Sequence, residues 1–170
     1  MSSNILKKKE IRLVSKLSSQ LSFSDIKNIC YLKDKQWKFG IKSQLKWYKI
    51  NIKRNDIHNL LYLSSNLIGY TALRVKTCKI DGSKKKNKYF LFDTLIINKK
   101  YRNLKLSSIL MNFNNFIIKQ FGYFSYLICK KELTNFYTKF GWLKLKKRDF
   151  HTLDRRLSYY GMIFNQKKYK

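Results

Sequence analysis

The chain of 170 residues contains no proline, only nine acidic residues and only three cysteines. Cys30, Cys78 and Cys129 are odd in number and far apart, so they do not form the framework of a disulfide-rich secreted domain. His58 and His151 are also too far apart in the sequence to give the spacing of a zinc site. We therefore expect a protein of a reducing compartment, with neither disulfides nor a bound metal.

Long apolar segments are also missing. No stretch approaches the roughly 20 consecutive apolar residues that a membrane-spanning helix needs. The N-terminus is basic, but no apolar segment follows its basic residues, so we expect no signal peptide. Together these absences predict a cytoplasmic protein without a transmembrane segment.

Positive charge is abundant, because 38 Lys and Arg residues give a net charge of +29. Such an excess is typical of proteins whose partner is a polyanion, such as nucleic acid, an anionic membrane surface or a phosphorylated ligand. However, only seven of these residues are Arg, the Lys residues are spread along the chain, Asn and Ile are abundant, and Pro is absent, which is the bias of AT-rich coding sequence. We interpret most of the charge as compositional and do not expect nucleic acid to be the partner. A basic nucleic-acid-binding protein is the alternative from another functional class.

The order of apolar patterns predicts a mixed fold. Hydrophobic residues make up 44% of the chain, enough for one domain with one core. Strand patterns alternate with helix patterns in the second half, which favours an α/β or α+β fold with a mixed sheet. The expected strands are 10–17, two within 58–78 around a turn at 64–66, 88–97, 123–129, 142–145 and 155–164. The expected helices are 22–36, 43–55 with Ser43 as its cap, 107–121 ended by Gly122, and a short one ended by Gly141.

One stretch carries a chemical signal. The strand pattern "DTLIIN" (93–98) is followed by the basic turn "KKYRNLKLSS" (99–108) and then by a helix. A strand that leads into a helix leaves amide groups pointing outward at the positive end of the helix dipole, where a pyrophosphate can bind. A plain strand-to-helix connection with solvated basic residues is the alternative interpretation.

The segments "DTLIINKKYRNLKLSSILM" (93–111) and "NFYTKFGWLKL" (135–145) together resemble the acetyl-CoA-binding half of the GNAT acetyltransferase superfamily. In that family an Arg or Gln is followed by x-x-Gly-x-Gly/Ala and a helix, and a later short helix carries Phe-Tyr and ends in Gly plus an aromatic residue. Here Arg102 opens the turn, and Phe136-Tyr137 and Gly141-Trp142 match the second signature. The resemblance covers about residues 10–163 in architecture and 91–142 in specific motif.

The resemblance implies a single α/β (α+β) domain over residues 1–170, with a mixed, mostly antiparallel central sheet of about six to seven strands flanked by about four helices. Residues 10–87 would form the acceptor-side half, 88–142 the acetyl-CoA-binding core, and 143–170 the closing strands and tail. We expect a monomer or a homodimer.

The resemblance also implies a binding site for acetyl-CoA. Leu95, Ile96 and Ile97 would offer backbone groups to the pantetheine arm, which binds in the manner of an added strand. Lys105 and Ser107 stand where the family has small residues, so the Lys105 side chain must point away from the ligand, and Ser107 can donate its hydroxyl. The expected diphosphate turn consists of Arg102, Asn103, Leu104, Lys105, Leu106, Ser107 and Ser108.

Two residues are candidates for proton transfer. In the family a Tyr at the position of Tyr137 protonates the departing CoA thiolate, and a carboxylate on the strand of Asp93 often deprotonates the acceptor. Tyr137 could instead be a core aromatic, since it falls at helical spacing with Phe136 and Phe140. Asp93 could instead be structural, bonded to Thr94 or to a neighbouring loop. Strand alternation places Asp93 on the same face as Leu95.

We therefore expect an N-acetyltransferase that uses acetyl-CoA as co-substrate and transfers the acetyl group by direct attack of a primary amine. The acceptor would be a small molecule, with an amino sugar as one candidate, and aromatic residues would either line its pocket or belong to the core: Trp37, Phe39, Trp47 and Tyr48. An acyl-carrier protein is an alternative donor, because a basic surface suits such an acidic partner. A degenerate GNAT fold without catalysis is a further alternative.

Overall fold

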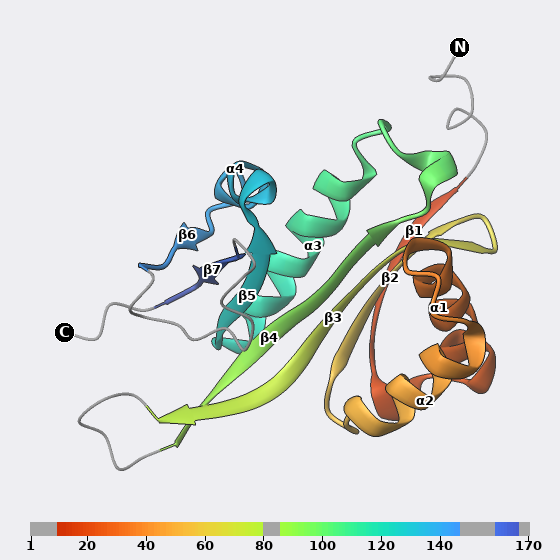
Figure 1. Cartoon of the computed structure of the whole chain (residues 1–170), viewed down its shortest axis with the longest axis horizontal. Coiled ribbons are helices and arrows are strands. Elements are labelled where there is room, and N and C mark those ends of the chain that lie inside the picture. The colour runs from red at the N-terminus through yellow and green to blue at the C-terminus, as the bar shows by residue number, and fades with distance from the viewer. Residues whose placement is uncertain (1–9, 80–85, 147–158, 167–170) are drawn as a thin grey trace. The chain divides into compact units, whose positions relative to one another are not determined.

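A computed structural model describes residues 10–79, 86–146 and 159–166 (Figure 1). The strands are β1 (Ile11–Leu17), β2 (Ile57–Leu63), β3 (Asn66–Lys79), β4 (Lys86–Ile97), β5 (Phe124–Lys130), β6 (Leu143–Lys144) and β7 (Tyr159–Phe164). The α-helices are α1 (Phe23–Gln36), α2 (Ile41–Asn51), α3 (Leu106–Phe121) and α4 (Thr134–Thr138). Short 3-10 helices are η2 (Ser18–Gln20), η3 (Lys99–Tyr101) and η4 (Lys131–Leu133).

The strands form one seven-stranded sheet in the order β1-β2-β3-β4-β5-β7-β6. The pairs β1–β2, β2–β3, β5–β7 and β6–β7 are antiparallel, whereas β4 and β5 are parallel. This confirms the predicted mixed, mostly antiparallel sheet and its accompanying helices.

The chain divides into two compact units. The first unit comprises residues 1–74 and 93–114, and the second comprises residues 75–92 and 115–170. The long elements β3, β4 and α3 each begin in one unit and end in the other. The domain boundaries expected from the sequence stay a prediction.

The two N-terminal helices begin in different ways. Ser22 caps α1, because its Oγ accepts a hydrogen bond from the Asp25 amide at 3.0 Å while the Asp25 carboxylate accepts one from the Ser22 amide at 3.1 Å. The prediction that Ser43 caps the second helix is wrong. Helix α2 begins at Ile41 after Gly40, whose φ of +83° suits glycine, so Ser43 lies within the first turn. The Gly40 amide is held by Asp34 Oδ1 at 2.7 Å, which fixes where the helix starts.

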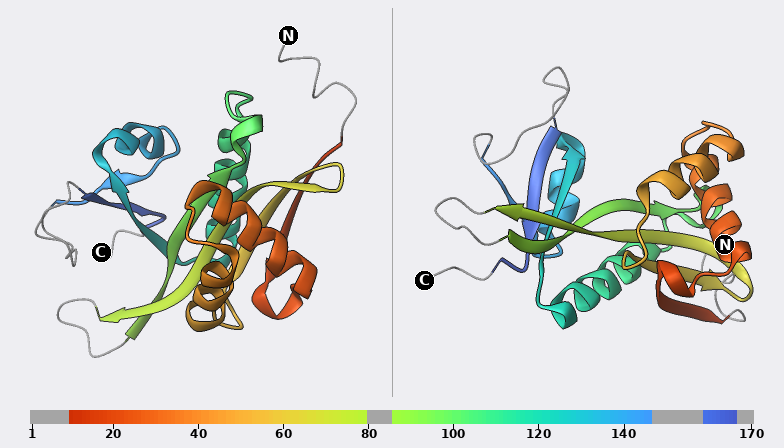
Figure 2. Two further views of the ribbon diagram at one scale, coloured as in Figure 1. Left: turned by 45° about the vertical axis from the view of Figure 1, so that its right-hand side comes forward. Right: turned by 90° about the horizontal axis from the view of Figure 1, so that it is seen from below.

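Two hydrophobic layers build the first unit, one on each face of its strands (Figure 2). The layer beneath α1 contains Ile29, Leu32, Leu60, Tyr62, Tyr70, Ala72 and Ile96. The layer beneath the start of α3 contains Leu61, Leu63, Ile68, Ile97, Leu106 and Leu110. Full burial of one such aliphatic side chain contributes about 1.5–3 kcal/mol, so these layers are the main source of stability for this unit.

The side-chain alternation of β4 is interrupted between Asp93 and Ile96. Ile96 packs beneath α1, and Asp93 forms an ion pair with Arg74, which also contacts α2. Leu95 instead packs against the layer beneath α3. Residues three apart do not share a face in a regular strand, so the pleat must be irregular here. The prediction that Asp93 and Leu95 lie on one face is therefore wrong.

The second unit has an aromatic core. Phe92, Tyr137 and Trp142 form ring contacts, with centroids 5.5 Å apart for Phe92–Trp142 and 6.1 Å apart for Phe92–Tyr137. Asn115 of α3 lies beneath them, where its Oδ1 accepts a hydrogen bond from Trp142 Nε1 at 3.0 Å and its Nδ2 donates one to the Phe140 carbonyl at 2.9 Å. These contacts fix the short helix α4 within this unit.

Candidate functional site

The turn between β4 and α3 has the backbone of a glycine-containing loop without any glycine. Asn103 has a φ of +65° and Lys105 a φ of +56°, both in the left-handed region that favours glycine. The Lys105 carbonyl accepts hydrogen bonds from the amides of Ser108 at 3.0 Å and Ile109 at 3.4 Å, and so starts helix α3. The Lys105 side chain is exposed. Lys105 thus adopts a backbone conformation that glycine adopts most easily.

Because of this geometry, the turn can hold an anion. The first amides of a helix have no acceptor within that helix. In α3 these are the amides of Leu106 and Ser107, because the first amide that donates to the Lys105 carbonyl is that of Ser108. They lie at the positive end of the dipole of a 16-residue helix. The exposed Lys105 adds positive charge beside them. A diphosphate is therefore a chemically suitable ligand for this turn.

Arg102 holds the turn in place. Its Nε donates to the Ile97 carbonyl at 3.2 Å, and its Nη2 donates to Gln36 Oε1 of α1 at 2.5 Å. A guanidinium has five N–H donors, so these two bonds leave further donors for a ligand. Its expected contact with a diphosphate stays a prediction, as do the backbone contacts of Leu95, Ile96 and Ile97 with a pantetheine arm.

Asp93 lies with the helices α1 and α2. Its Oδ2 is 3.2 Å from Arg74 Nη1 of β3, and 22% of its side chain is exposed. The sequence left open a structural bond of Asp93 to Thr94 or to a loop. The bond that forms is instead an ion pair with Arg74 of the neighbouring strand β3. Whether Asp93 also acts on an acceptor amine stays a prediction.

Tyr137 is buried in the second unit, with only 7% of the residue exposed. Burial raises the pKa of its phenol, and the nearby Cys129 thiol adds to this effect. The hydroxyl therefore carries its proton at neutral pH, as a proton donor must. The packing role that the sequence left open is present in the aromatic core. Tyr137 belongs to a different unit from Asp93 and the turn, so a shared site with them stays a prediction.

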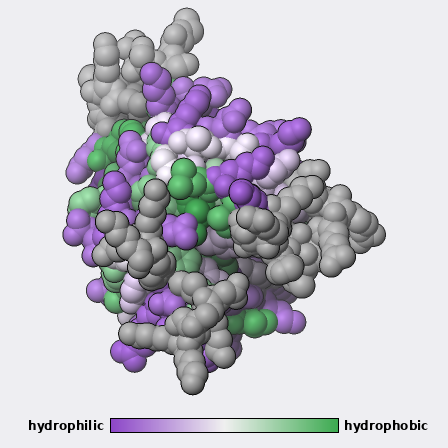
Figure 3. All heavy atoms as spheres, turned by 90° about the vertical axis from the view of Figure 1, so that its left-hand side faces the viewer, coloured by the Kyte–Doolittle hydropathy of each residue, from purple (hydrophilic) through white to green (hydrophobic). Residues whose placement is uncertain are grey.

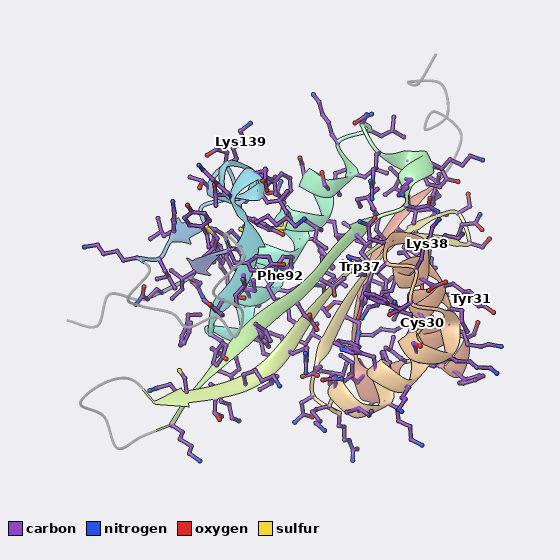
Figure 4. All side chains as sticks on the ribbon, viewed as in Figure 1. Cys30, Tyr31, Trp37, Lys38, Phe92 and Lys139 are labelled. Carbon is purple, nitrogen blue, oxygen red and sulfur yellow. The ribbon has the colours of Figure 1, made fainter. Side chains whose placement is uncertain are left out.

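The N-terminal aromatic residues divide into two groups. Trp37 follows the end of α1 (Figure 4) and is 38% exposed, and Phe39 is 72% exposed, so neither is a core residue. Trp47 of α2 instead contacts cations, with Lys33 Nζ 3.6 Å and Arg74 Cζ 5.4 Å from its ring centroid. Tyr48 packs beside His58 with ring centroids 5.8 Å apart.

Lys33 and Arg74 were not singled out by the sequence reasoning. A signal for Lys33 was present, because it follows Ile29 and Leu32 at the spacing of one helix face and so interrupts an apolar stripe with a charge. Arg74 follows Tyr70 and Ala72 in the alternation of β3. Both signals are weak without knowledge of which elements pack together.

No helix within the described ranges is long and apolar enough to cross a membrane. Over the same residues no cluster of three or more His, Cys, Asp or Glu side chains could hold a metal ion. Cys30, Cys78 and Cys129 are free thiols. His151 lies outside the described residues.

Comparison with known proteins identifies the fold. No protein-family model matches the sequence, and no curated protein matches it. Solved structures do match: Escherichia coli ElaA has 19% identity and a TM-score of 0.64, over 91% of this chain and 99% of that chain. An acetyltransferase of the GNAT family from Staphylococcus aureus has 16% identity and a TM-score of 0.61, over 91% and 98% of the two chains.

Arabidopsis thaliana Naa50, in complex with the bisubstrate analogue CoA-Ac-MVNAL, has 17% identity and a TM-score of 0.61, over 89% of this chain and 97% of that chain. At these identities the likeness establishes the fold. The chain therefore has the GNAT fold over nearly its whole length, as the resemblance of its two motifs predicted.

Proposed function

We propose that this GNAT-fold chain transfers an acetyl group from acetyl-CoA to the primary amine of a small acceptor. The observation that carries the proposal is the turn of Asn103 and Lys105, which keeps a glycine-like backbone at the start of α3 although glycine is absent. A left-handed lysine costs about 1–2 kcal/mol, so the conformation of Lys105 points to a required shape, whereas asparagine adopts this region more easily. That shape suits the diphosphate of CoA.

The chemistry needs two proton movements. The acceptor amine loses a proton, its nitrogen attacks the carbonyl carbon, the N–C bond forms, and the C–S bond breaks to release the CoA thiolate. We assign the first proton to Asp93, directly or through water, and the proton taken up by the thiolate to Tyr137. A backbone N–H of β4 would polarise the carbonyl as it gains negative charge. No covalent enzyme intermediate is needed.

The acceptor class is open to several amines. Exposed Trp37 and Phe39 at the end of α1 could stack on a ring, which supports an amino sugar among the candidates.

Binding of acetyl-CoA tests the first half of the proposal. Calorimetric titration should give saturable binding, and Arg102→Glu should weaken it by about tenfold or more because it places a negative charge beside the diphosphate. Lys46→Glu, the matching charge reversal at an exposed position of α2, should leave the affinity unchanged. Lys105→Gly should retain saturable binding, since glycine adopts the same backbone, and should lower the affinity only by the loss of the exposed positive charge.

The same titration with single-stranded DNA separates the alternative function. We expect only weak binding that is lost in moderate salt, as for any basic surface. Absence of acetyl-CoA binding at millimolar ligand would overturn the proposed function, and salt-resistant DNA binding would favour the nucleic-acid alternative.

Turnover tests the role of Tyr137. Replacement by Phe removes the hydroxyl while keeping the ring that packs on Phe92 and Trp142. We expect kcat to fall by about 100-fold with little change in the KM for acetyl-CoA, because only the proton donor is lost. Phe136→Leu, a change to its neighbour in the same helix, is the packing control. Equal kcat for the Phe variant and the wild type would remove Tyr137 from the mechanism.

A further inference from the structure

Two cations share one aromatic ring in the first unit. Lys33 of α1 is only 7% exposed, yet its Nζ lies 3.6 Å from the Trp47 ring centroid. Arg74 Cζ lies 5.4 Å from the same centroid. Both positive groups therefore lie close to the same ring. Most of each side chain is removed from solvent.

The cations outnumber the carboxylate that faces them. Asp93 pairs with Arg74 Nη1 at 3.2 Å, and its charge also acts on Lys33. Arg74 Nη2 donates to the Asn51 carbonyl at 2.9 Å, but Arg74 Nε is buried without a hydrogen-bond partner among the described residues. The Lys33 Nζ instead lies against the face of the Trp47 ring. One positive charge and at least one N–H donor are thus left over.

Such an arrangement is costly without a ligand. A buried donor without an acceptor, such as Arg74 Nε, costs about 1–3 kcal/mol, and contact of a cation with an indole contributes only about 1–2 kcal/mol. Burial lowers the pKa of the Lys33 ammonium, while the negative charge of Asp93 opposes this change. Charges that are largely buried are usually paired, so the anionic group of a ligand is a chemically suitable partner for these two cations.

We propose that Lys33 and Arg74 bind the carboxylate of the acceptor while Asp93 receives its ammonium group, so that the acceptor is an amino acid or a similar amino-carboxylate. This inference rests on the proposed acyl transfer and names the substrate class of that reaction. Two cations and one carboxylate complement a zwitterion, in which the carboxylate and the amine are close together. An amino sugar carries only the amine, so it would add a third positive charge beside Lys33 and Arg74 and bring no anion to offset it.

Matched acceptors test the inference with the full chain. Glycine, L-phenylalanine and L-lysine are each compared with the corresponding carboxamide, which keeps the amine and removes the carboxylate charge. Binding is measured by calorimetry without acetyl-CoA, and transfer by release of the CoA thiol. We expect at least one acid to exceed its amide by about tenfold or more in both affinity and kcat/KM.

Lys33→Met tests the residue itself, because Met keeps the length of the stem and removes the charge. We expect this variant to lose the preference for the acid through a higher KM, with unchanged affinity for acetyl-CoA. Lys35→Met, at an exposed position of the same helix, should keep the preference. Arg74→Met serves as the second variant if Lys33→Met does not fold.

The outcomes separate this inference from the proposed function. Acetyl-CoA binding together with equal or better use of every amide, or with no acceptance of any pair, would overturn the amino-carboxylate class and leave the cofactor site intact. A preference for the acid in binding, lost in Lys33→Met, supports the inference even where acetyl-CoA does not bind. Failure of both acetyl-CoA binding and acid preference would overturn both.

Discussion

His58 of β2 is fully buried, and both of its ring nitrogens have partners. Nε2 lies 2.8 Å from Ser18 Oγ, and Nδ1 lies 2.8 Å from the hydroxyl of Tyr70. In a neutral imidazole one nitrogen donates and the other accepts, so this site suits the uncharged ring. Burial lowers the pKa of His58 to about 4, and the positive charge of Lys33 contributes in the same direction.

This histidine should make the fold sensitive to acid. In the unfolded chain the imidazole has a pKa near 6.5, so between pH 6.5 and 4 the unfolded state binds more protons than the folded state. The contribution of His58 is present above pH 6.5 and is lost as the pH falls toward 4, with a limit of about 3 kcal/mol. Urea unfolding at a series of pH values measures the slope.

His58→Gln is the comparison, since carboxylates also titrate at low pH. The variant should be less stable at pH 7 but should show a smaller loss of stability between pH 6.5 and 4.5 than the wild type. Identical slopes for the two proteins would mean that His58 is not the titrating group.

At the scale of single residues, the sequence predicted where a residue lies in the fold when a motif contained that residue. Lys105 and Ser107 could be assigned to the turn from the letters around them, but the left-handed backbone of Lys105 could not, because lysine rarely adopts it. The cluster of Lys33, Arg74 and Asp93 was not predictable either. Its members come from three elements, and only their packing brings the charges together.

Helix α3 is tied to the sheet by a polar contact inside an apolar layer. Asn114 is fully buried, and its Oδ1 accepts hydrogen bonds from Asn59 Nδ2 of β2 at 3.0 Å and from Thr71 Oγ1 of β3 at 3.1 Å. The Asn114 Nδ2 has no partner among the described residues. The Asn114 Oδ1 thus accepts hydrogen bonds from side chains of two neighbouring strands.

Asn114→Ala should lower the free energy of unfolding by about 2 kcal/mol. The substitution leaves two buried donors unpaired, but it also removes the unpartnered Nδ2, which limits the loss. Asn112→Ala, at an exposed position two residues earlier, should change stability by less than about 0.5 kcal/mol. Equal effects of the two substitutions in urea unfolding would show that the bonds of Asn114 contribute little.

At the scale of elements, local signals predicted most of the order and type. The left-handed Gly122 and Gly141 follow α3 and α4 as expected, with φ of +68° and +80°. The prediction of Ser43 as the cap was wrong because α2 starts after Gly40, whose positive φ suits glycine, a residue that gives no side-chain capping signal in the sequence. The irregular pleat of β4 gave no sequence signal, since each of its faces is apolar.

At the scale of the whole molecule, the net charge of +29 is the dominant property. Only two ion pairs form among the described residues, Lys16–Asp25 and Arg74–Asp93. On the face shown in Figure 3, hydrophilic residues surround small hydrophobic patches. The fold followed from two short motifs and the element order in spite of the high net charge.

The backbone of the turn at Asn103 and Lys105 has a consequence for how such sites are recognised. A phosphate cradle is defined by the angles that aim its amides, and glycine is only the residue that reaches these angles most easily. Asn103 and Lys105 reach such angles without glycine. A search by backbone angles would therefore find turns of this kind in chains where a search for a pattern of glycines finds none.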